Sequence, residues 1–162
     1  MEYNREKAVA YAHEWAFRRN PRYYNFDAIG GDCTNYVSQC LYAGCPLMNY
    51  TPDLGWFYSS PQKRSAAWSG VPYLYNFLTR RKGRGPYGET RPLSDAQPGD
   101  IVQLSFDGVK WSHSLIVTQT GEHPQPDNIL LATHTYDADN RPLNSYIFEQ
   151  SRLIHILGGY EQ

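Results

Sequence analysis

The sequence has few cysteines, no excess of basic residues and no long apolar run, and each of these shortages argues against a class of protein. Its 162 residues include 3 cysteines, an odd number that argues against a complete disulfide framework. The formal net charge is −1, so there is no basic surplus to neutralise the phosphates of a nucleic acid. No apolar run reaches the roughly 18 to 20 residues that a membrane span needs. We therefore expect no nucleic-acid partner and no membrane span.

The first seven residues are too polar to form a secretory signal peptide. We expect either a cytoplasmic protein or a domain trimmed from a secreted one, and the sequence leaves the compartment and the oligomeric state open. The length predicts a single domain covering residues 1–162. A domain of this size buries a substantial core without disulfides or a metal, and we expect no cofactor.

Helical patterns come first in the chain and strand patterns second. Apolar residues recur at helical spacing over residues 4–19 and 33–43, and residues 71–78 predict a short helix. From residue 98 onward the period changes to two, and turn residues separate the segments. The pattern predicts an α+β fold whose strands form an antiparallel meander closing toward a half-barrel. The expected strands are 101–106, 112–118, 128–135 and 152–157.

The candidate nucleophile is Cys33, which follows the sequence Gly-Gly-Asp and opens the second predicted helix. A thiol at a helix N-terminus lies among free backbone N–H groups and near the positive end of the helix dipole, which favours the thiolate. The two glycines leave room for a substrate backbone, and Asp32 is a candidate N-cap. Cys40, two helical turns later, is expected in the core, and Cys45 in a turn beyond the helix end. We therefore expect Cys33 to be exposed at the helix tip.

The candidate base is His113, because it opens a predicted strand that holds the imidazole rigidly enough to take the thiol proton. If strands 112–118 and 128–135 pair with a symmetric register, His113 lies opposite His134 and Leu115 lies opposite Ala132, all on one face. A second imidazole beside the base fixes its tautomer and orientation, so His134 is the predicted third member of a triad. The competing candidates are Asp137 and Asn140.

Aromatic residues are concentrated between the predicted nucleophile and the predicted base. Aromatic rings contact both peptide backbone and sugar at a low entropic cost, so this region is a candidate for substrate binding. The alternative for any single ring is packing in a secondary core under long loops. The candidate substrate-binding residues are Asp32, Tyr24, Trp56 and Trp68.

These motifs carry a family resemblance. Residues 30–41 (GGDCTNYVSQCL), 98–102 (PGDIV), 113–114 (HS) and 133–137 (THTYD) resemble the "Putative amidase domain" family, a branch of the papain-like NlpC/P60 and CHAP cysteine hydrolases. The likeness extends over nearly the whole chain, and its cysteine block is the most specific part. It implies a papain-like fold, in which the cysteine helix packs on an antiparallel sheet that carries the histidine and a third polar residue. It also implies hydrolysis of amide bonds, often in cell-wall peptides.

The predicted activity is that of a thiol amidase or cysteine peptidase with Cys33 as nucleophile and His113 as acid and base. The expected substrate is a peptide or another amide, with a peptidoglycan stem peptide as one candidate. Two other classes stay open. One is a peptide- or glycan-binding domain with a vestigial site, and the other is a metal-binding module that uses Cys33, His113 and His134. The second lacks the paired ligand spacings that are typical of zinc sites.

Overall fold

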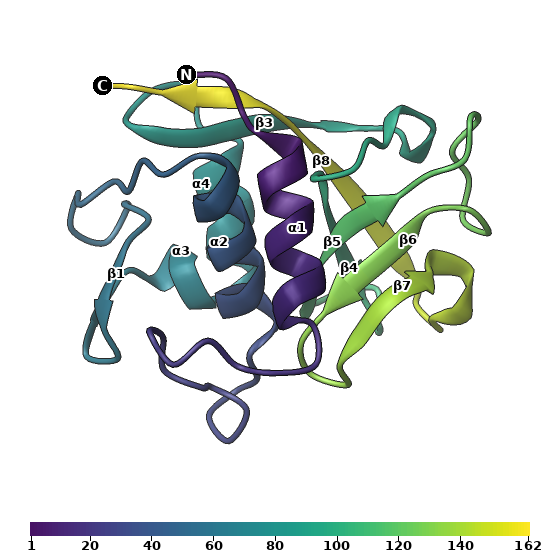
Figure 1. Cartoon of the computed structure of the whole chain (residues 1–162), viewed down its shortest axis with the longest axis horizontal. Helices are drawn as coiled ribbons and strands as arrows, with labels where there is room; N and C mark the ends of the chain where they lie inside the picture. Colours follow the sequence, from purple (N-terminus) through teal and green to yellow (C-terminus); the bar gives the residue numbers. More distant parts are fainter.

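Helices pack against an antiparallel sheet in the computed structural model, which describes residues 1–162 (Figure 1). The expected α+β class is confirmed. Six strands are ordered β3-β8-β4-β5-β6-β7, and every neighbouring pair is antiparallel. The helices are α1 (Arg5–Trp15), α2 (Cys33–Gly44), α3 (Ala66–Ser69) and α4 (Val71–Leu78), with 3-10 turns η1 (Leu93–Asp95) and η2 (Leu143–Ser145). The strands are β1 (Tyr58–Ser60), β2 (Lys63–Arg64), β3 (Gly85–Arg91), β4 (Ile101–Ser105), β5 (His113–Gln119), β6 (Leu130–Thr133), β7 (Ala138–Pro142) and β8 (Gln150–Tyr160).

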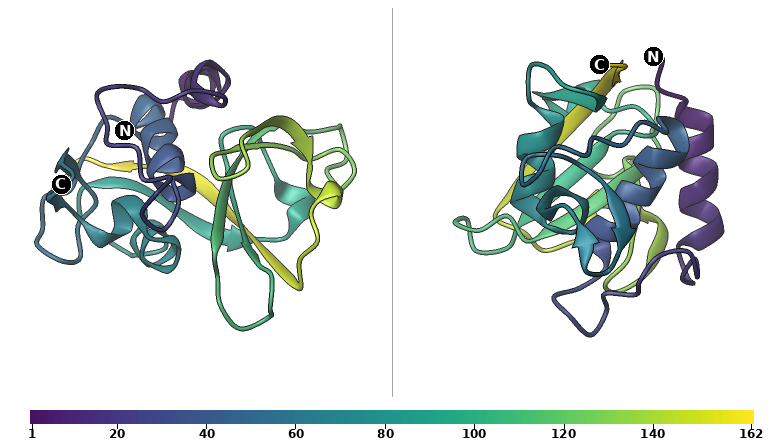
Figure 2. Two further views of the ribbon diagram at one scale, coloured as in Figure 1. Left: turned by 90° about the horizontal axis from the view of Figure 1, so that it is seen from below. Right: turned by 90° about the vertical axis from the view of Figure 1, so that its left-hand side faces the viewer.

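The expected strands 101–106, 112–118 and 128–135 form as β4, β5 and β6 and pair in that order, and this part of the sheet curls toward a half-barrel (Figure 2). The fourth expected strand, 152–157, lies within β8, which pairs with β4 instead of following β6. Two strands of the main sheet, β3 and β7, were not predicted. Their sequences, GPYGETR and ADNRP, consist largely of residues that disfavour strands, so only tertiary pairing makes them extended. The long strand β8 supplies the partner for β3 and also pairs with β4, whereas β6 supplies the partner for β7.

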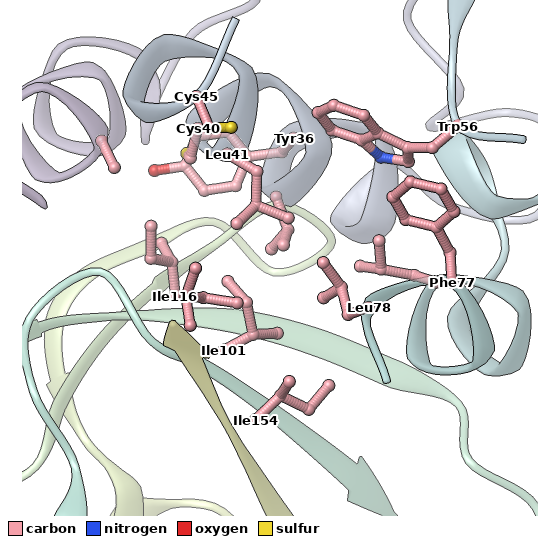
Figure 3. Close-up of a cluster of buried hydrophobic side chains, with 14 of the residues drawn as sticks. Tyr36, Cys40, Leu41, Cys45, Trp56, Phe77, Leu78, Ile101, Ile116 and Ile154 are labelled. Atoms are coloured by element: carbon pink, nitrogen blue, oxygen red, sulfur yellow. The ribbon is translucent and has the colours of Figure 1, made fainter. Parts of the chain in front are cut away.

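The two faces of the sheet bury separate apolar clusters. The face toward α1, α2 and α4 contributes isoleucines to a cluster of 20 buried residues, among them Ile101, Ile116 and Ile154 (Figure 3). The inner face of the half-barrel contributes alternate residues, such as Leu115 and Val117, to a cluster of 9. This alternation follows from the period of two along a strand. None of the helices is both long and apolar enough to cross a bilayer.

Helix α2 is the central helix, and it is buried on almost every side rather than on one apolar face. Its buried polar side chains therefore need partners inside the protein, and they have them. The hydrogen bonds join Thr34 to Ser114, Asn35 to Trp68, Ser38 to Trp56 and Gln39 to Tyr11. These bonds fix the rotation of α2 about its axis and hence the position of its first residue, Cys33.

Cys40 lies in the core as expected, fully buried on α2 (Figure 3). Cys45 lies beyond the helix end as expected, and it is also fully buried. We expect Cys40→Ser to lower the free energy of unfolding by about 1–3 kcal/mol, because it places a hydroxyl in apolar surroundings. Urea denaturation measures this difference. A stability equal to that of wild type would contradict the packing of this face of the helix.

Candidate active site

The loop before α2 brings Cys33 to the end of the sheet. Gly31 adopts a left-handed backbone with φ of 97°, and a Cβ atom there would lie 2.9 Å from Oγ1 of Thr135. Only glycine combines this backbone with so close an approach to the turn between β6 and β7. The first hydrogen bond of α2 runs from the N–H of Tyr36 to the carbonyl of Asp32. The N–H groups of Cys33 and its two successors therefore have no acceptor within the helix.

The Cys33 thiol lies against the start of β5. Sγ lies 3.7 Å from the Thr34 hydroxyl, which in turn lies 2.9 Å from the Ser114 hydroxyl on β5. Cys33 is only 7% exposed, which corrects the expectation of an exposed thiol at the helix tip. Burial raises the pKa of the Cys33 thiol, and the backbone of Ser114 with the side chain and backbone of Thr34 offsets only part of that rise. In the resting protein the group is therefore a thiol, which needs a base before it can act as a nucleophile.

His113 has the properties of that base. Burial, followed by the charge of the Arg141 guanidinium, lowers the pKa of His113 to about 4, so the imidazole is neutral at pH 7. Its Nε2 lies 3.4 Å from Oγ1 of Thr133 on β6. The Thr133 hydroxyl donates its own proton to a backbone carbonyl, that of Ser114 at 2.9 Å or that of His134 at 2.8 Å. It can then only accept from His113 Nε2–H, which leaves the lone pair of Nδ1 free to take a proton.

Sequence reasoning missed Thr133 because the predicted register of this hairpin was wrong by one residue. The structure pairs Ile116 with Ala132, where the symmetric register paired Leu115 with Ala132. A β-bulge toward the end of β5 interrupts the ladder, and such a bulge leaves no reliable mark in the sequence. Because side chains alternate along a strand, a slip of one residue moves His134 to the opposite face from His113.

His134 lies on the helix-facing side of the sheet, where it makes a buried ion pair with Asp32. Its Nδ1 lies 2.5 Å from Oδ2 of Asp32, its Nε2 lies 2.7 Å from the carbonyl of Trp15, and its ring stacks on Tyr36 at 4.0 Å. Both ring nitrogens therefore lie within hydrogen-bond distance of a protein oxygen, which fixes the orientation of the ring. No hydrogen bond joins it to His113. The pair connects the residue before Cys33 to the end of α1.

The competing third residues also lie away from His113. Asp137 forms two hydrogen bonds with Arg19, at 2.9 and 3.0 Å, and Asn140 accepts from the Thr118 hydroxyl at 2.7 Å. Neither side chain contacts the imidazole. Thr133 is therefore the side chain that the structure places against the candidate base.

The aromatic candidates separate into buried and exposed residues. Trp56 and Trp68 are fully buried, and their indole N–H groups donate to Ser38 and Asn35 of α2. Neither ring presents a face to a substrate, so packing is their role. Tyr24 is 42% exposed, with its ring edge against a neighbouring phenylalanine. Asp32 is 1% exposed and fully engaged with protein donors, so it holds the loop rather than a substrate.

A pocket of about 380 Å³ opens beside His113. Its rim includes the turn between β6 and β7, where Thr135 and Tyr136 both have positive φ, 62° and 60°. A β-branched residue in this conformation is strained, and here Oγ1 of Thr135 accepts from the N–H of Asp32 at 3.1 Å. The strained turn thus connects the pocket wall to the residue before Cys33. The lining residues are Phe106, Ser112, His113, Thr135, Tyr136, Arg141 and Tyr146.

An α+β fold that brings a buried thiol at a helix start to a strand beginning with a neutral imidazole has the parts of a hydrolase. Residues 2–157 match the family described as "Putative amidase domain", so the chain belongs to that family, whose general activity is hydrolysis of amide C–N bonds. The chain is also 30% identical over 143 residues to "Uncharacterized protein YhbB" of Bacillus subtilis (strain 168). That alignment covers 87% of this chain and 44% of the relative, so the chain spans less than half the relative's length. No solved structure matches the chain.

Proposed function

We propose that residues 1–162 form a single papain-like domain of the NlpC/P60 and CHAP kind, which hydrolyses amides through Cys33. The observation that carries this proposal is the link between Cys33 and the start of β5: Sγ lies 3.7 Å from the Thr34 hydroxyl, and that hydroxyl lies 2.9 Å from the hydroxyl of Ser114. The thiol therefore lies at the strand that begins with His113. The N–H groups at the start of α2, which have no acceptor within the helix, add the donors that an oxyanion needs.

The proposed reaction has two steps. In the first, Nδ1 of His113 takes the Cys33 proton while sulfur bonds to the amide carbonyl carbon, and the N–H of Cys33 with one further donor holds the oxyanion. The C–N bond then breaks, and the amine leaves with the proton from His113. In the second step, water gives a proton to His113 and attacks the thioester. The C–S bond breaks, the acid leaves, and the proton returns to sulfur.

Thr133 orients the base in this mechanism, and His134 positions the nucleophile through Asp32. A peptide of the peptidoglycan stem type is the proposed substrate, in keeping with the family resemblance. Incubating the protein with a library of muropeptides and other peptides, followed by mass spectrometry, tests the activity. New masses that differ by one added water and disappear in Cys33→Ala would support the proposal.

One observation favours a second function, a peptide- or glycan-binding domain with a vestigial site. Cys33 is 7% exposed, and no hydrogen bond joins its Sγ to His113. Hydrolysis therefore requires Cys33 and His113 to approach each other when substrate binds, whereas binding alone does not. Binding of library members without any cleavage would favour the second.

The pH profile of the proposed enzyme follows from the low pKa of its base. His113 must be neutral to accept the Cys33 proton, and its pKa is lowered to about 4 by burial and by Arg141. Activity should therefore fall as the pH drops through about 4, rather than through the usual value of about 6.5. The acid limb of kcat/KM against pH measures this midpoint. A midpoint near 6.5 would contradict a buried, neutral imidazole as the base.

The alkylation rate of Cys33 should depend on pH as that of a buried thiol does, and not as that of an activated thiolate. Burial raises the pKa of its thiol, so we expect slow reaction with iodoacetamide at pH 6 and a steady increase toward alkaline pH. Mass spectrometry of the three cysteine peptides follows the reaction at each site. Cys40 is the internal control, because burial raises its pKa as well and it lies far from the base. Rapid alkylation of Cys33 at pH 6 would contradict the resting thiol.

Thr133→Val tests the orienting role, because valine keeps the shape of threonine and removes the hydroxyl. The variant should reduce kcat by roughly 10- to 100-fold, in line with the cost of an unpaired buried donor. Thr133→Ser retains the hydroxyl and should retain most of the activity. A valine variant with unchanged kcat would contradict the role, whereas a loss of stability alone would be seen in the midpoint of thermal unfolding.

A further inference from the structure

Arg141 lies in the pocket beside His113 with part of its hydrogen-bonding capacity unused. Its guanidinium packs on the Tyr146 ring at 3.9 Å, and its Nε and one terminal nitrogen donate to Ser145. The other terminal nitrogen has no partner, and no carboxylate forms an ion pair with this arginine. Stacking and the two bonds hold the group in place, so little conformational entropy remains to be lost when an anion binds.

The pocket is lined by one charged side chain, and its charge is positive. Among the lining residues Arg141 is the only one that is charged at neutral pH, because His113 is neutral and no lining residue is acidic. Two aromatic rings also line the pocket, those of Phe106 and Tyr146, and their centroids lie 6.1 and 6.3 Å from that of the His113 ring. A cavity of about 380 Å³ with apolar walls and one fixed cation suits a small organic anion.

From these contacts, and resting on the proposed function, we propose that the substrate is an amide with a carboxylate near its scissile bond, and that Arg141 binds this carboxylate in the pocket beside His113. A guanidinium matches a carboxylate geometrically and binds it through charge-assisted hydrogen bonds. The pairing of Arg141 with a carboxylate also affects the pKa of His113. A bound carboxylate offsets the charge of Arg141, so it should raise the pKa of His113 toward neutrality when substrate is present.

The test uses matched sets of N-acetyl dipeptides, one with free carboxylates and one with carboxamides, which differ only in that group. They are titrated into Cys33→Ala, so that nothing is cleaved, and the ring signals of His113 are followed by NMR. We expect the acids to bind roughly 10- to 100-fold more tightly than the amides, the loss expected for a charge-assisted hydrogen bond. We also expect the acids, and not the amides, to raise the pH midpoint of the His113 signals.

Two variants in the same background assign the effect to Arg141. Arg141→Gln should remove the preference for acids, and Arg141→Lys should retain part of it because the charge is kept. Arg22→Gln is the control for net charge, because Arg22 is exposed and forms no ion pair, and it should retain the full preference. Equal binding of acids and amides, no binding of either, or an unchanged preference in Arg141→Gln would overturn the proposal.

The outcomes separate this proposal from the proposed function. If wild type cleaves peptides with equal efficiency whether or not a carboxylate is present, amide hydrolysis stands and the role of Arg141 fails. If Arg141 selects acids while no peptide is cleaved, the carboxylate site stands and the hydrolase fails. A higher KM with little change in kcat for Arg141→Gln on an acidic substrate would show that the arginine acts in binding.

Discussion

Cys33→Ala is expected to abolish amide hydrolysis, with a fall in kcat of roughly 10⁴- to 10⁶-fold, because the substitution removes the atom that forms the acyl intermediate. The variant should fold normally, since it deletes one sulfur atom at the end of a helix whose other contacts remain. Product formation from a cleaved library peptide measures the loss, and circular dichroism with thermal unfolding measures the fold.

Cys40→Ala is the matched control for this experiment. It deletes the same sulfur atom from the same helix, at a site that is fully buried and far from the base. It should lose stability but keep its kcat once folded. Full activity in Cys33→Ala, or an equal loss of kcat in both variants, would rule out Cys33 as the nucleophile.

Asp32→Ala is expected to have the largest effect on stability, lowering the free energy of unfolding by about 3–5 kcal/mol. The carboxylate accepts hydrogen bonds from the N–H of Phe26, the amide of Asn35 and the ring of His134. Its removal leaves these buried groups, including the His134 ring, without their acceptor. Urea denaturation monitored by tryptophan fluorescence measures the difference.

Asp27→Ala is the matched control, because Asp27 pairs with Arg19 at the surface. Its side chain is 44% exposed, and such pairs contribute about 0–1 kcal/mol. The double variant Asp32→Ala/His134→Ala should lose less stability than the sum of the two single variants, because the two groups depend on each other. A loss in Asp32→Ala no greater than that in Asp27→Ala would contradict the buried ion pair.

Elements that depend on local sequence were predicted well. Residues 71–78 form α4 as expected, and α2 begins at Cys33, where a glycine-rich turn meets helical spacing. Four of the strands match segments with a period of two. Helix α1 ends at Trp15, before the predicted end at residue 19. The candidate nucleophile and base could be identified for the same reason, since each lies at the start of a local element.

Features that depend on pairing between distant segments were not predicted. The strands β3 and β7 have sequences that resemble turns and become extended only beside β8 and β6. The bulge in β5 changes the register, so Thr133 rather than His134 contacts the His113 ring. Trp56 and Trp68 are buried because they pack on α2, which is enclosed on almost every side. The sequence of α2 is rich in polar residues and therefore does not indicate that the helix is enclosed.

The sequence by itself determined the α+β class, the starts of the elements that carry Cys33 and His113, and the family. These depend on periodicity, turn residues and local motifs, which act over a few residues. Only the tertiary structure decided how exposed the thiol is, which side chain contacts the imidazole of His113, and that Asp32 pairs with His134 across 102 positions of the chain. Those properties depend on desolvation and on the register between strands, which are set when segments far apart in sequence pack together.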